Sequence, residues 1–320
     1  MGPGDLRVML GGLGPSRSGQ VVLEGGHGDD AGAVRLDGDR ALLHTVDVIT
    51  PIVDDPEIFG RIAAANAVSD IYAMAGRPTS AVSILGVPKA LPRPVVGRIL
   101  EAGRALLAEC GAHLVGGHTL KDAELRLGFA VTGEAPRRRL ATHRGAKAGQ
   151  LLVLTKPLGT GLLFAAGEAL SPAARRAWER SMSTPNRAAG ERAQALGIRA
   201  ATDVTGFGLA GHAAHLARGS GVDLVLSGSA LPRLPGVDAR LAAGAETGAG
   251  RVNRDAYRAW VTYGRVDEAT RILASDPQTS GGLLLAVPPR RLSAFADLEH
   301  WVVGEVRPPR AARSKVRFVA

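Results

Sequence analysis

Apolar residues recur along the chain with two spacings, and each spacing predicts one kind of element. Residues Ala41–Val48 are rich in apolar and β-branched side chains, which is typical of a strand. From Pro56 to Ala75 the apolar residues return with helical periodicity, which predicts a helix with one buried face. That face would carry Ile58, Ile62, Ala65, Val68, Ile71 and Met74. The chain therefore begins as an alternation of strands and helices.

The same patterns continue to residue 287 and divide the chain into two halves. The first half adds strands at Thr79–Leu85, His113–Val115 and Leu127–Thr132, and a helix at Val95–Glu109 that Gly111 would end. The second half predicts strands at Gln150–Thr155, Arg199–Asp203, Asp223–Leu226 and Gly282–Val287, and helices at Ser171–Leu196 (interrupted near Pro185) and Gly208–Arg218.

A basic segment containing Gly and Ala, Pro136–Gly149, marks the boundary between these halves. We therefore predict two mixed α/β (α+β) domains, residues 1–140 and 141–320. Their similar size and mixture of elements also allow an old duplication, although no short repeat is visible.

Charge excludes few functions, because the positive residues are scattered. The formal net charge is +9, and only five of the 39 basic residues are lysine. The densest basic runs, Arg137–Arg139 and Arg307–Arg317, have no interleaved aromatic residues on which bases could stack. We interpret the charge as a solvated surface that suits an anionic small substrate such as a nucleotide, and we expect no nucleic-acid partner.

The single cysteine, Cys110, excludes an internal disulfide and a cysteine-based zinc site. It ends an apolar helical stretch, which favours a buried, inert thiol over a nucleophile. No 18-residue apolar run predicts a membrane span, and the first residues lack the pattern of a signal peptide. We therefore expect a cytoplasmic protein with no membrane partner.

Acidic residues at strand ends and on one helix face form the first candidate site. Asp29 and Asp30 are adjacent in a Gly-flanked loop, where two carboxylates repel each other unless a cation or hydrogen-bond donors neutralise them. The other members are Asp47 near the end of a strand, Asn66 and Asp70 four apart on the predicted helix, and Asp203 at the end of a strand. Oxygen ligands of this kind favour Mg²⁺, which usually arrives with phosphates. The alternative is separate turn residues, helix caps and solvated charges.

Three glycine-rich segments could bring backbone N–H groups close to an anion. They are Val115–Thr119, Thr155–Gly161 and Thr205–His212, and the last joins a strand to a helix whose N-terminus could hold a phosphate. Tight turns also use glycine, so each segment alone is weak support. His118 and His212 could equally cap or hydrogen-bond their own loops.

The third segment contains a literal G-x-G-x-x-G at Gly206, Gly208 and Gly211. A dinucleotide-binding fold would need an acidic residue at the end of the following strand to bind the ribose. Asp223 instead begins its predicted strand, so the pattern does not favour an NAD enzyme.

Together, six strings resemble the selenophosphate synthetase family of the aminoimidazole-ribonucleotide-synthetase-like ATP-using superfamily. They are GDDAGAV (Gly28–Val34), Thr45–Pro78, GGHT (Gly116–Thr119), TKPLGTG (Thr155–Gly161), TDVTGFGLAGH (Thr202–His212) and DPQTSGGLLLAV (Asp276–Val287). The resemblance runs from about residue 5 to about residue 306, and the last two strings are its most specific part.

The resemblance implies a homodimer in which the N-terminal domains of two copies pair their sheets into a shared β-barrel. It implies the reaction of ATP, selenide and water to selenophosphate, AMP and orthophosphate, and K⁺ as a further cation beside Mg²⁺. Asp30, Asp70 and Asp203 would hold Mg²⁺. The residues along the nucleotide would be Asp29, Asp47, Asn66, Asp70, Gly116, Gly117 and His118. The protein that delivers selenide, if one exists, is not identified by these motifs.

One feature of the family has no counterpart in the printed sequence. The family carries a catalytic Cys or selenocysteine and, three residues on, a lysine upstream of GDDAGAV, whereas no residue before Asp29 is Cys or Lys. Residues 2–10 resemble the short helix that follows that lysine. A selenocysteine codon read as a stop, a truncation and a natural loss are all open explanations, as is replacement of the lysine by Arg7 or Arg17. We expect the printed chain to make little or no selenophosphate. The alternative function is a catalytically silent ATP-binding homologue with a regulatory or partner-binding role.

Overall fold

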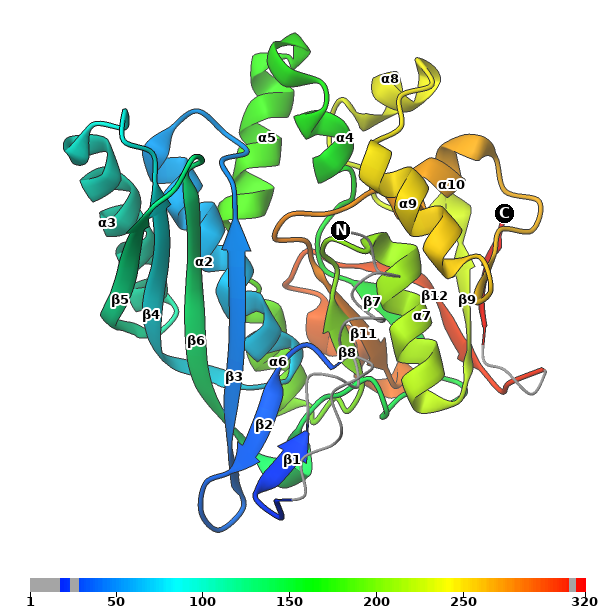
Figure 1. Cartoon of the computed structure of the whole chain (residues 1–320). Helices are drawn as coiled ribbons and strands as arrows, with labels where there is room; N and C mark the ends of the chain where they lie inside the picture. Colours follow the sequence, from blue (N-terminus) through cyan, green and yellow to red (C-terminus); the bar gives the residue numbers. More distant parts are fainter. Residues whose placement is uncertain (1–17, 24–28, 311–314) are drawn as a thin grey trace.

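The computed structural model describes residues 18–23, 29–310 and 315–320, and Figure 1 traces the chain through two sheets that carry helices. The six-stranded sheet is built from residues 21–136 and the seven-stranded sheet from residues 151–319. Both parts mix strands with helices, so the predicted fold class of two mixed α/β parts is confirmed. None of the described helices is long and apolar enough to cross a membrane. Residues 2–10, Arg17 and residues 24–28 of the Gly-flanked loop before Asp29 lie outside the described residues.

The first sheet has the strand order β1-β2-β3-β6-β4-β5 and is antiparallel except for the pair β4 and β5. Its elements are β1 (Val21–Leu23), β2 (Gly32–Arg35), β3 (Arg40–Ile49), α2 (Pro56–Ala73), β4 (Arg77–Val87), α3 (Arg93–Glu109), β5 (His113–Lys121) and β6 (Arg126–Pro136). The parallel pair follows from the crossover through α3, because two parallel neighbours need a long connection. The predicted helix at Val95–Glu109 lies inside these bounds, as do the predicted strands at Ala41–Val48, Thr79–Leu85, His113–Val115 and Leu127–Thr132. The helix predicted from Pro56 to Ala75 ends two residues earlier, at Ala73.

Helix α2 begins where its sequence predicts and buries most of its length. The carboxylate of Asp55 accepts hydrogen bonds from the backbone N–H groups of Glu57 at 2.8 Å and Ile58 at 2.9 Å, which caps the helix ahead of Pro56. Gly60 lets α2 approach α3 closely, because a Cβ at this position would collide with the backbone carbonyl of Ile99. The helices α2 and α3 cover one face of the first sheet (Figure 1).

The other face of this sheet carries exposed apolar side chains. Val46 and Val48 on β3 and Val82 on β4 are 56%, 45% and 39% exposed, and they alternate with residues that point toward α2. On the edge strand β5, Val115 and Leu120 are exposed as well. In the described part of the chain no element lies over this face (Figure 1).

The second sheet has the strand order β10-β13-β9-β12-β7-β11-β8. Its strands are β7 (Leu151–Leu154), β8 (Ala201–Asp203), β9 (Asp223–Ser227), β10 (Val261–Thr262), β11 (Leu283–Val287), β12 (Trp301–Arg307) and β13 (Val316–Val319). The helices are α4 (Thr160–Phe164), α5 (Pro172–Ser183), α6 (Arg187–Ala195), α7 (Gly208–Ser220), α8 (Val237–Ala242), α9 (Gly248–Tyr257) and α10 (Glu268–Ser275). The predicted helix at Ser171–Leu196 is thus two helices with a break at Pro185, as its sequence indicates.

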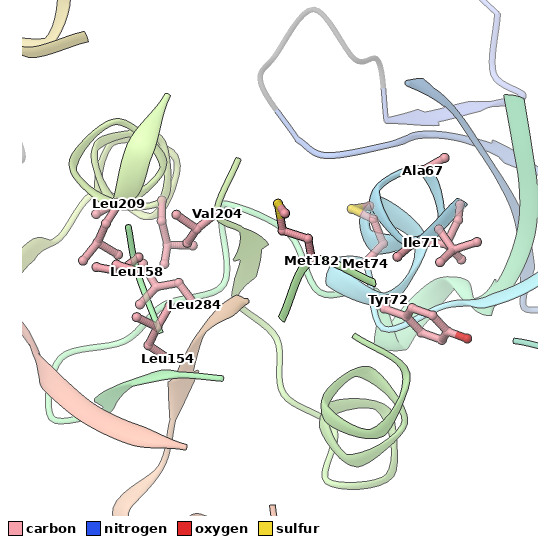
Figure 2. Packing of buried hydrophobic residues seen from close by; sticks show 14 of the residues in the cluster. Ala67, Ile71, Tyr72, Met74, Leu154, Leu158, Met182, Val204, Leu209 and Leu284 are labelled. Atoms are coloured by element: carbon pink, nitrogen blue, oxygen red, sulfur yellow. The ribbon is translucent and has the colours of Figure 1, made fainter. Parts of the chain in front are cut away.

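Helix α2 joins the two sheets, because it packs against β3 and β6 on one side and against α5, α6 and β8 on the other. Figure 2 shows Met182 of α5 close to Met74, which follows the last residue of α2, with Ile71 of α2 beyond it. A second group lies around Leu154, Leu209 and Leu284 in the second sheet and α7. These buried side chains belong to one continuous hydrophobic cluster. The edge strand β8 therefore ends beside a helix of the first half.

One predicted turn is a strand instead. The sequence places Val115–Thr119 in a glycine-rich loop after a short strand, but β5 continues through it to Lys121. Its residues pair in parallel with β4, so that Val82 lies opposite Gly116 and Ile84 opposite His118. The ladder supplies the hydrogen bonds that a loop would have left open, and glycine alone could not have indicated this.

Candidate functional site

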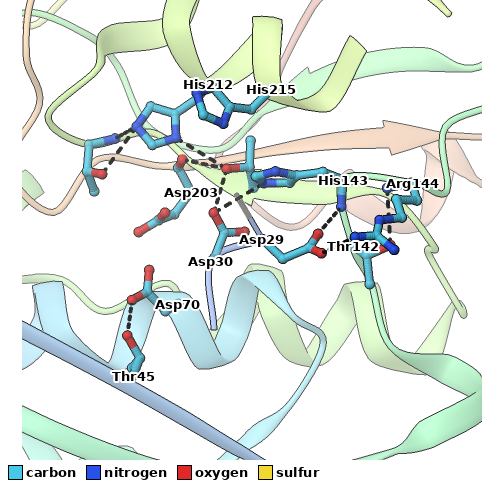
Figure 3. Close-up of polar contacts among 12 residues, drawn as sticks. Asp29, Asp30, Thr45, Asp70, Thr142, His143, Arg144, Asp203, His212 and His215 are labelled. Atoms are coloured by element: carbon cyan, nitrogen blue, oxygen red, sulfur yellow. Dashed lines mark hydrogen bonds and ion pairs between the residues drawn. The ribbon is translucent and has the colours of Figure 1, made fainter. Parts of the chain in front are cut away.

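The three predicted metal ligands lie where the two halves join, with ligand atoms of Asp30 and Asp203 within 4.8 Å of each other and Asp70 near enough to interact with both charges. Asp30 precedes β2, Asp70 lies in the last turns of α2, and Asp203 is the last residue of β8. Figure 3 shows the carboxylates of Asp70 and Asp203 directed into the space between α2 and β8, with Asp30 beside them. Residues separated by more than 170 positions are thereby brought to one point.

Asp30 and Asp203 are buried carboxylates with free oxygen atoms. The Oδ1 atom of Asp30 accepts a hydrogen bond from the Thr202 hydroxyl at 2.8 Å, and His143 Nε2 lies 3.3 Å from it without hydrogen-bond geometry. The Oδ2 atoms of both aspartates are buried and have no hydrogen-bond partner. Buried oxygen atoms are nearly always paired in native proteins, so these two call for a ligand.

The side of the site formed by α2 and β3 is more completely hydrogen-bonded. Asp70 accepts a short hydrogen bond from the hydroxyl of Thr45, and Asp47 Oδ2 accepts one from the Asn66 amide at 2.8 Å. Thr45 and Asp47 are two residues apart on β3, so both point toward α2. Asn66 and Asp70 likewise share one side of α2, as their spacing predicts.

Several carboxyl groups in this cluster hold their protons more tightly than usual. Burial, together with the charge of Asp30, raises the pKa of Asp47 to about 6. Burial and the neighbouring carboxylates raise the pKa of Asp70 and of Asp203 well above the ordinary value. A cation placed among them would remove this repulsion and favour the ionised forms. The cluster therefore has the charge and the ligand atoms of a divalent-cation site.

His212 lies close to these carboxylates, but its two ring nitrogens are hydrogen-bonded to other groups. One ring nitrogen of His212 comes within metal-ligand range of Asp30 and Asp203. However, Nε2 accepts the Thr205 N–H at 3.1 Å, which leaves the proton on Nδ1, 3.3 Å from the Thr202 hydroxyl. Burial lowers the pKa of His212 well below its usual value, so the ring is neutral. It therefore orients Thr202, and through Thr202 it orients Asp30; it is not itself free to bind a cation.

Asp29 turns away from its neighbour. Its Oδ1 accepts the backbone N–H of His143 at 2.7 Å, while Oδ2 is buried without a hydrogen-bond partner, 4.0 Å from the Arg144 guanidinium. Figure 3 shows Asp29 directed toward residues 142–144 and Asp30 directed toward Asp203. The carboxylates of Asp29 and Asp30 thus point into different surroundings, which reduces the repulsion expected between two adjacent acidic residues.

The turn Thr155–Gly161 does not offer its N–H groups to an anion from outside. The Gln278 side-chain oxygen accepts the N–H groups of Gly159 and Thr160 at 2.9 and 3.1 Å, and Asp276 Oδ2 accepts those of Gly161 and Leu162 at 3.1 Å each. The prediction of an open anion site here is therefore wrong. The protein supplies its own acceptors from the segment that carries DPQTSGG.

The remaining predicted residues lie far from the carboxylates within one chain. Gly116, Gly117 and His118 are on β5, separated from β3 by β6 and β4, which corresponds to three strand spacings or about 14 Å. Gly116 and His118 share the exposed face with Val82 and Ile84, whereas Asp47 faces α2. Asp223 begins β9, as the sequence predicts, and one of its carboxylate oxygens lies 3.2 Å from the Arg317 guanidinium. Cys110 is buried, and burial raises its pKa, in agreement with an inert thiol.

Sequence reasoning missed four polar residues that shape the site. Thr45 and Thr202 hold Asp70 and Asp30, and only their strand positions next to a recognised aspartate could have indicated this. His143 lies in the basic segment that marked the boundary, where no local pattern distinguishes it. Lys156 is 6% exposed at the end of β7. Its place two residues after the apolar run Leu151–Leu154 was the available signal.

Comparison with known proteins gives two matching family models and several relatives of similar length. Residues 28–135 match the family model AIR synthase related protein, N-terminal domain, and residues 147–316 match AIR synthase related protein, C-terminal domain. The chain is 43% identical to selenide, water dikinase of Nitratidesulfovibrio vulgaris strain DSM 19637 / Miyazaki F over 96% of this chain and 91% of that protein.

Two solved structures share the fold at lower identity. Thiamine-monophosphate kinase from Stenotrophomonas maltophilia K279a has a TM-score of 0.67 at 20% identity, covering 98% of this chain and 93% of that one. Hydrogenase maturation protein HypE in complex with ATP has a TM-score of 0.65 at 19% identity, covering 90% and 84%. At such identities the likeness concerns the arrangement of the chain alone.

Proposed function

The chain belongs to the selenide, water dikinase family, and on that premise we propose that it uses ATP, selenide and water to form selenophosphate, AMP and orthophosphate. The observation that carries the proposal beyond family membership is the group of buried carboxylates with unpaired oxygen atoms between the two halves. Residues 1–140 would bind nucleotide and Mg²⁺ and form the dimer contact, and residues 141–320 would complete the site.

Asp30, Asp70 and Asp203 fit Mg²⁺ by the nature of their donor atoms. The site offers hard carboxylate oxygens, contains no thiolate among the described residues, and keeps its one nearby imidazole hydrogen-bonded. Two of the three aspartates have a buried oxygen atom without a partner. Bound Mg²⁺ would neutralise charge on the phosphates during phosphoryl transfer.

The protein's own residues would bind and orient the nucleotide. Asp203 comes from the second half, whereas Asp30 and Asp70 come from the first, so the phosphates would lie between the halves. The Asn66 amide donates a hydrogen bond to Asp47, and the Thr45 hydroxyl donates one to Asp70. These two hydrogen bonds hold both carboxylates beside α2. Such fixed positions are the main contribution a protein makes to phosphoryl transfer. Asp29, held against residues 142–144, would lie at the margin of the nucleotide.

A second copy of the chain is part of this proposal. The family resemblance implies sheets paired into a barrel, and the open apolar face of the first sheet has the composition that such pairing needs. Gly116, Gly117 and His118 lie on or beside that face, far from Asp47 of their own chain. We therefore assign their proposed nucleotide contacts to the dimer.

Replacing Val82 by Glu tests this arrangement, because it places a charge in the middle of the proposed contact. We expect the variant to sediment as a monomer where the wild-type chain sediments as a dimer. Val252→Glu, at a valine on α9 that is 49% exposed against 39% for Val82, is the matched control and should leave the assembly unchanged. A wild-type chain that is monomeric at all concentrations would contradict the dimer.

The reaction itself is tested by ³¹P NMR with ATP, Mg²⁺ and selenide under anaerobic conditions, beside the Nitratidesulfovibrio vulgaris relative. We expect selenophosphate, AMP and orthophosphate to form together and only with selenide. Parallel runs in potassium and sodium buffers examine the implied K⁺. Selenide-independent conversion of ATP to ADP would contradict the proposed reaction.

A silent ATP-binding homologue is the alternative to this enzyme activity. A chain that binds ATP with Mg²⁺ and leaves it unchanged with selenide would be a silent ATP-binding homologue. The NMR experiment separates the two, because only the enzyme yields a phosphorus–selenium signal.

A further inference from the structure

Lys156 is a buried amine that the proposed chemistry does not use. Its side chain lies at the end of β7, and the residue is 6% exposed. The amine donates hydrogen bonds to the backbone carbonyls of Thr184 at 2.6 Å and Ser280 at 2.7 Å, and lies 3.5 Å from the Ser280 hydroxyl. No carboxylate of the described residues forms an ion pair with it. A lysine in this setting is costly to bury, so its contacts need an explanation.

The main partner of Lys156 is held in an unfavourable backbone conformation. Ser280 has φ of 49°, and only one other non-glycine residue in the described ranges, Ala75, has a positive φ. This conformation costs a residue with a side chain on the order of 1 kcal/mol or more, so surrounding contacts must enforce it. The two hydrogen bonds from Lys156 to Ser280 are such contacts.

The Ser280 turn leads directly to the proposed nucleotide residues. The N–H of Ser280 donates to Asn66 Oδ1 at 2.9 Å, and the Asn66 amide donates to Asp47 Oδ2 at 2.8 Å. The next residue, Gly281, is also held, because its carbonyl accepts the Asn186 amide at 2.8 Å. One hydrogen-bonded chain therefore runs from Lys156 in the second half to Asp47 in the first.

We propose that Lys156 is a positioning residue of the nucleotide site, which fixes the Ser280 turn and thereby the orientation of Asn66 and Asp47. This inference rests on the proposed function, since it names the group that prepares that site for ATP. It assigns to Lys156 no contact with ATP or Mg²⁺. The lysine acts across the junction of the two halves, where a small rotation of one half would break the chain of hydrogen bonds.

Protonation does not alter this geometry. Burial lowers the pKa of Lys156 to about 7, against a smaller opposing effect of Asp203. The charged amine can donate to all three acceptors, and the neutral amine can donate to the two carbonyls while accepting the Ser280 hydroxyl proton. Both forms can hold the turn.

The test compares Lys156→Met, Ser280→Gly and the double variant, with Lys147→Met as the control at an exposed lysine. Affinity for ATP with Mg²⁺ is measured by calorimetry, well below the unfolding temperature of each variant. We expect Lys156→Met to lose about tenfold or more in affinity, as other residues that orient ligands do. Ser280→Gly keeps both backbone groups and adopts positive φ without strain, so it is the background against which the double variant is compared.

The double variant separates positioning from simple stabilisation. If Lys156 acts by enforcing a strained turn, Ser280→Gly makes that enforcement less necessary, and the double variant should regain part of the lost affinity. A purely structural role would lower the unfolding temperature of Lys156→Met and leave its affinity unchanged. Lys156→Met that folds and binds within about twofold of wild type would overturn the inference.

Two other outcomes are also decisive. If neither Lys156→Met nor the double variant folds, Lys156 is a requirement of the fold, and the positioning role is wrong. If the wild-type chain itself shows no Mg²⁺-dependent ATP binding, the proposed function fails first, which distinguishes that failure from one confined to Lys156.

Discussion

Two buried polar regions flank α2, and they differ in how completely their atoms are hydrogen-bonded. In the carboxylate region the Oδ2 atoms of Asp29, Asp30 and Asp203 are buried without partners. In the lysine region Lys156 donates to the Ser280 carbonyl and Asn186 donates to the Gly281 carbonyl. None of the side chains of Lys156, Ser280 and Asn186 has a fully buried polar atom without a hydrogen-bond partner. The buried oxygen atoms of the carboxylate region would be paired only by a bound group, whereas the buried polar atoms of the lysine region are paired within the protein.

On the proposed function, this difference separates a region that binds from a region that supports it. Unpaired buried oxygens and like charges destabilise the unliganded chain, a cost that is expected of the proposed cation site. Fully paired groups next to them fix the geometry in which that site is offered. Removing one group from each region should therefore have opposite effects on the stability of the unliganded protein.

Asp203→Asn should give the largest effect. The amide cannot replace a charged oxygen ligand, so affinity for ATP with Mg²⁺ should fall by about 100-fold or more in calorimetry. The same change replaces a carboxyl group by a neutral amide. Burial raises the pKa of that carboxyl group well above the ordinary value, which shows that its ionised form is unfavourable in the folded chain. The unliganded variant should therefore unfold at a higher temperature than wild type.

Asp238→Asn is the matched control for this prediction. Its side chain is 74% exposed and pairs with Arg233, so neither affinity nor unfolding temperature should change measurably. An Asp203→Asn variant that keeps wild-type affinity would show that the carboxylate region is not the cation site.

Lys156→Met should change the pH dependence of stability. Burial lowers the pKa of Lys156 to about 7, while the unfolded chain keeps its ordinary value near 10.4. Between these values only the unfolded state holds the proton, so wild-type stability should rise with pH relative to the variant by about 1.4 kcal/mol per pH unit. Urea unfolding of both proteins across this range measures the difference. Parallel slopes for the two proteins would mean that Lys156 stays charged when folded.

Thr202→Val should give the smallest of these effects. It removes the hydroxyl that donates to Asp30 and receives the proton of His212, but it keeps the shape of the side chain. We expect a loss of about tenfold in Mg²⁺-dependent ATP affinity with a folded protein. Thr262→Val, at an exposed threonine on β10, provides the comparison. An equal result for the two variants would remove Thr202 from the site.

Local pattern was sufficient for most of the elements and for the residues that gather around α2. The spacing of Asn66 and Asp70 and the strand-end positions of Asp47 and Asp203 follow from periodicities that the fold keeps. The prediction failed for Val115–Thr119, because consecutive glycines indicate a turn while a parallel neighbour strand imposed a ladder. The position of β4 beside Val115–Thr119 depends on contacts between residues that are distant in sequence, so a local pattern could not predict it.

The lysine region could not have been derived from the sequence. Lys156, Asn66 and Ser280 lie in three separate segments, and their hydrogen bonds exist only after the two halves have packed together. Likewise, the acceptors that fill the turn Thr155–Gly161 come from Asp276 and Gln278, more than 110 positions away. The sequence indicates which residues are chemically able to act, and the tertiary packing decides which of them are already occupied.

The most direct test of the central claim is the affinity of the wild-type chain for ATP, measured by calorimetry with Mg²⁺ and again with a chelator in place of Mg²⁺. Because the buried carboxylates would repel unaccompanied phosphates, we predict binding with Mg²⁺ and no detectable binding without it. Equal affinity under both conditions would contradict the claim that this carboxylate region is a cation site for ATP.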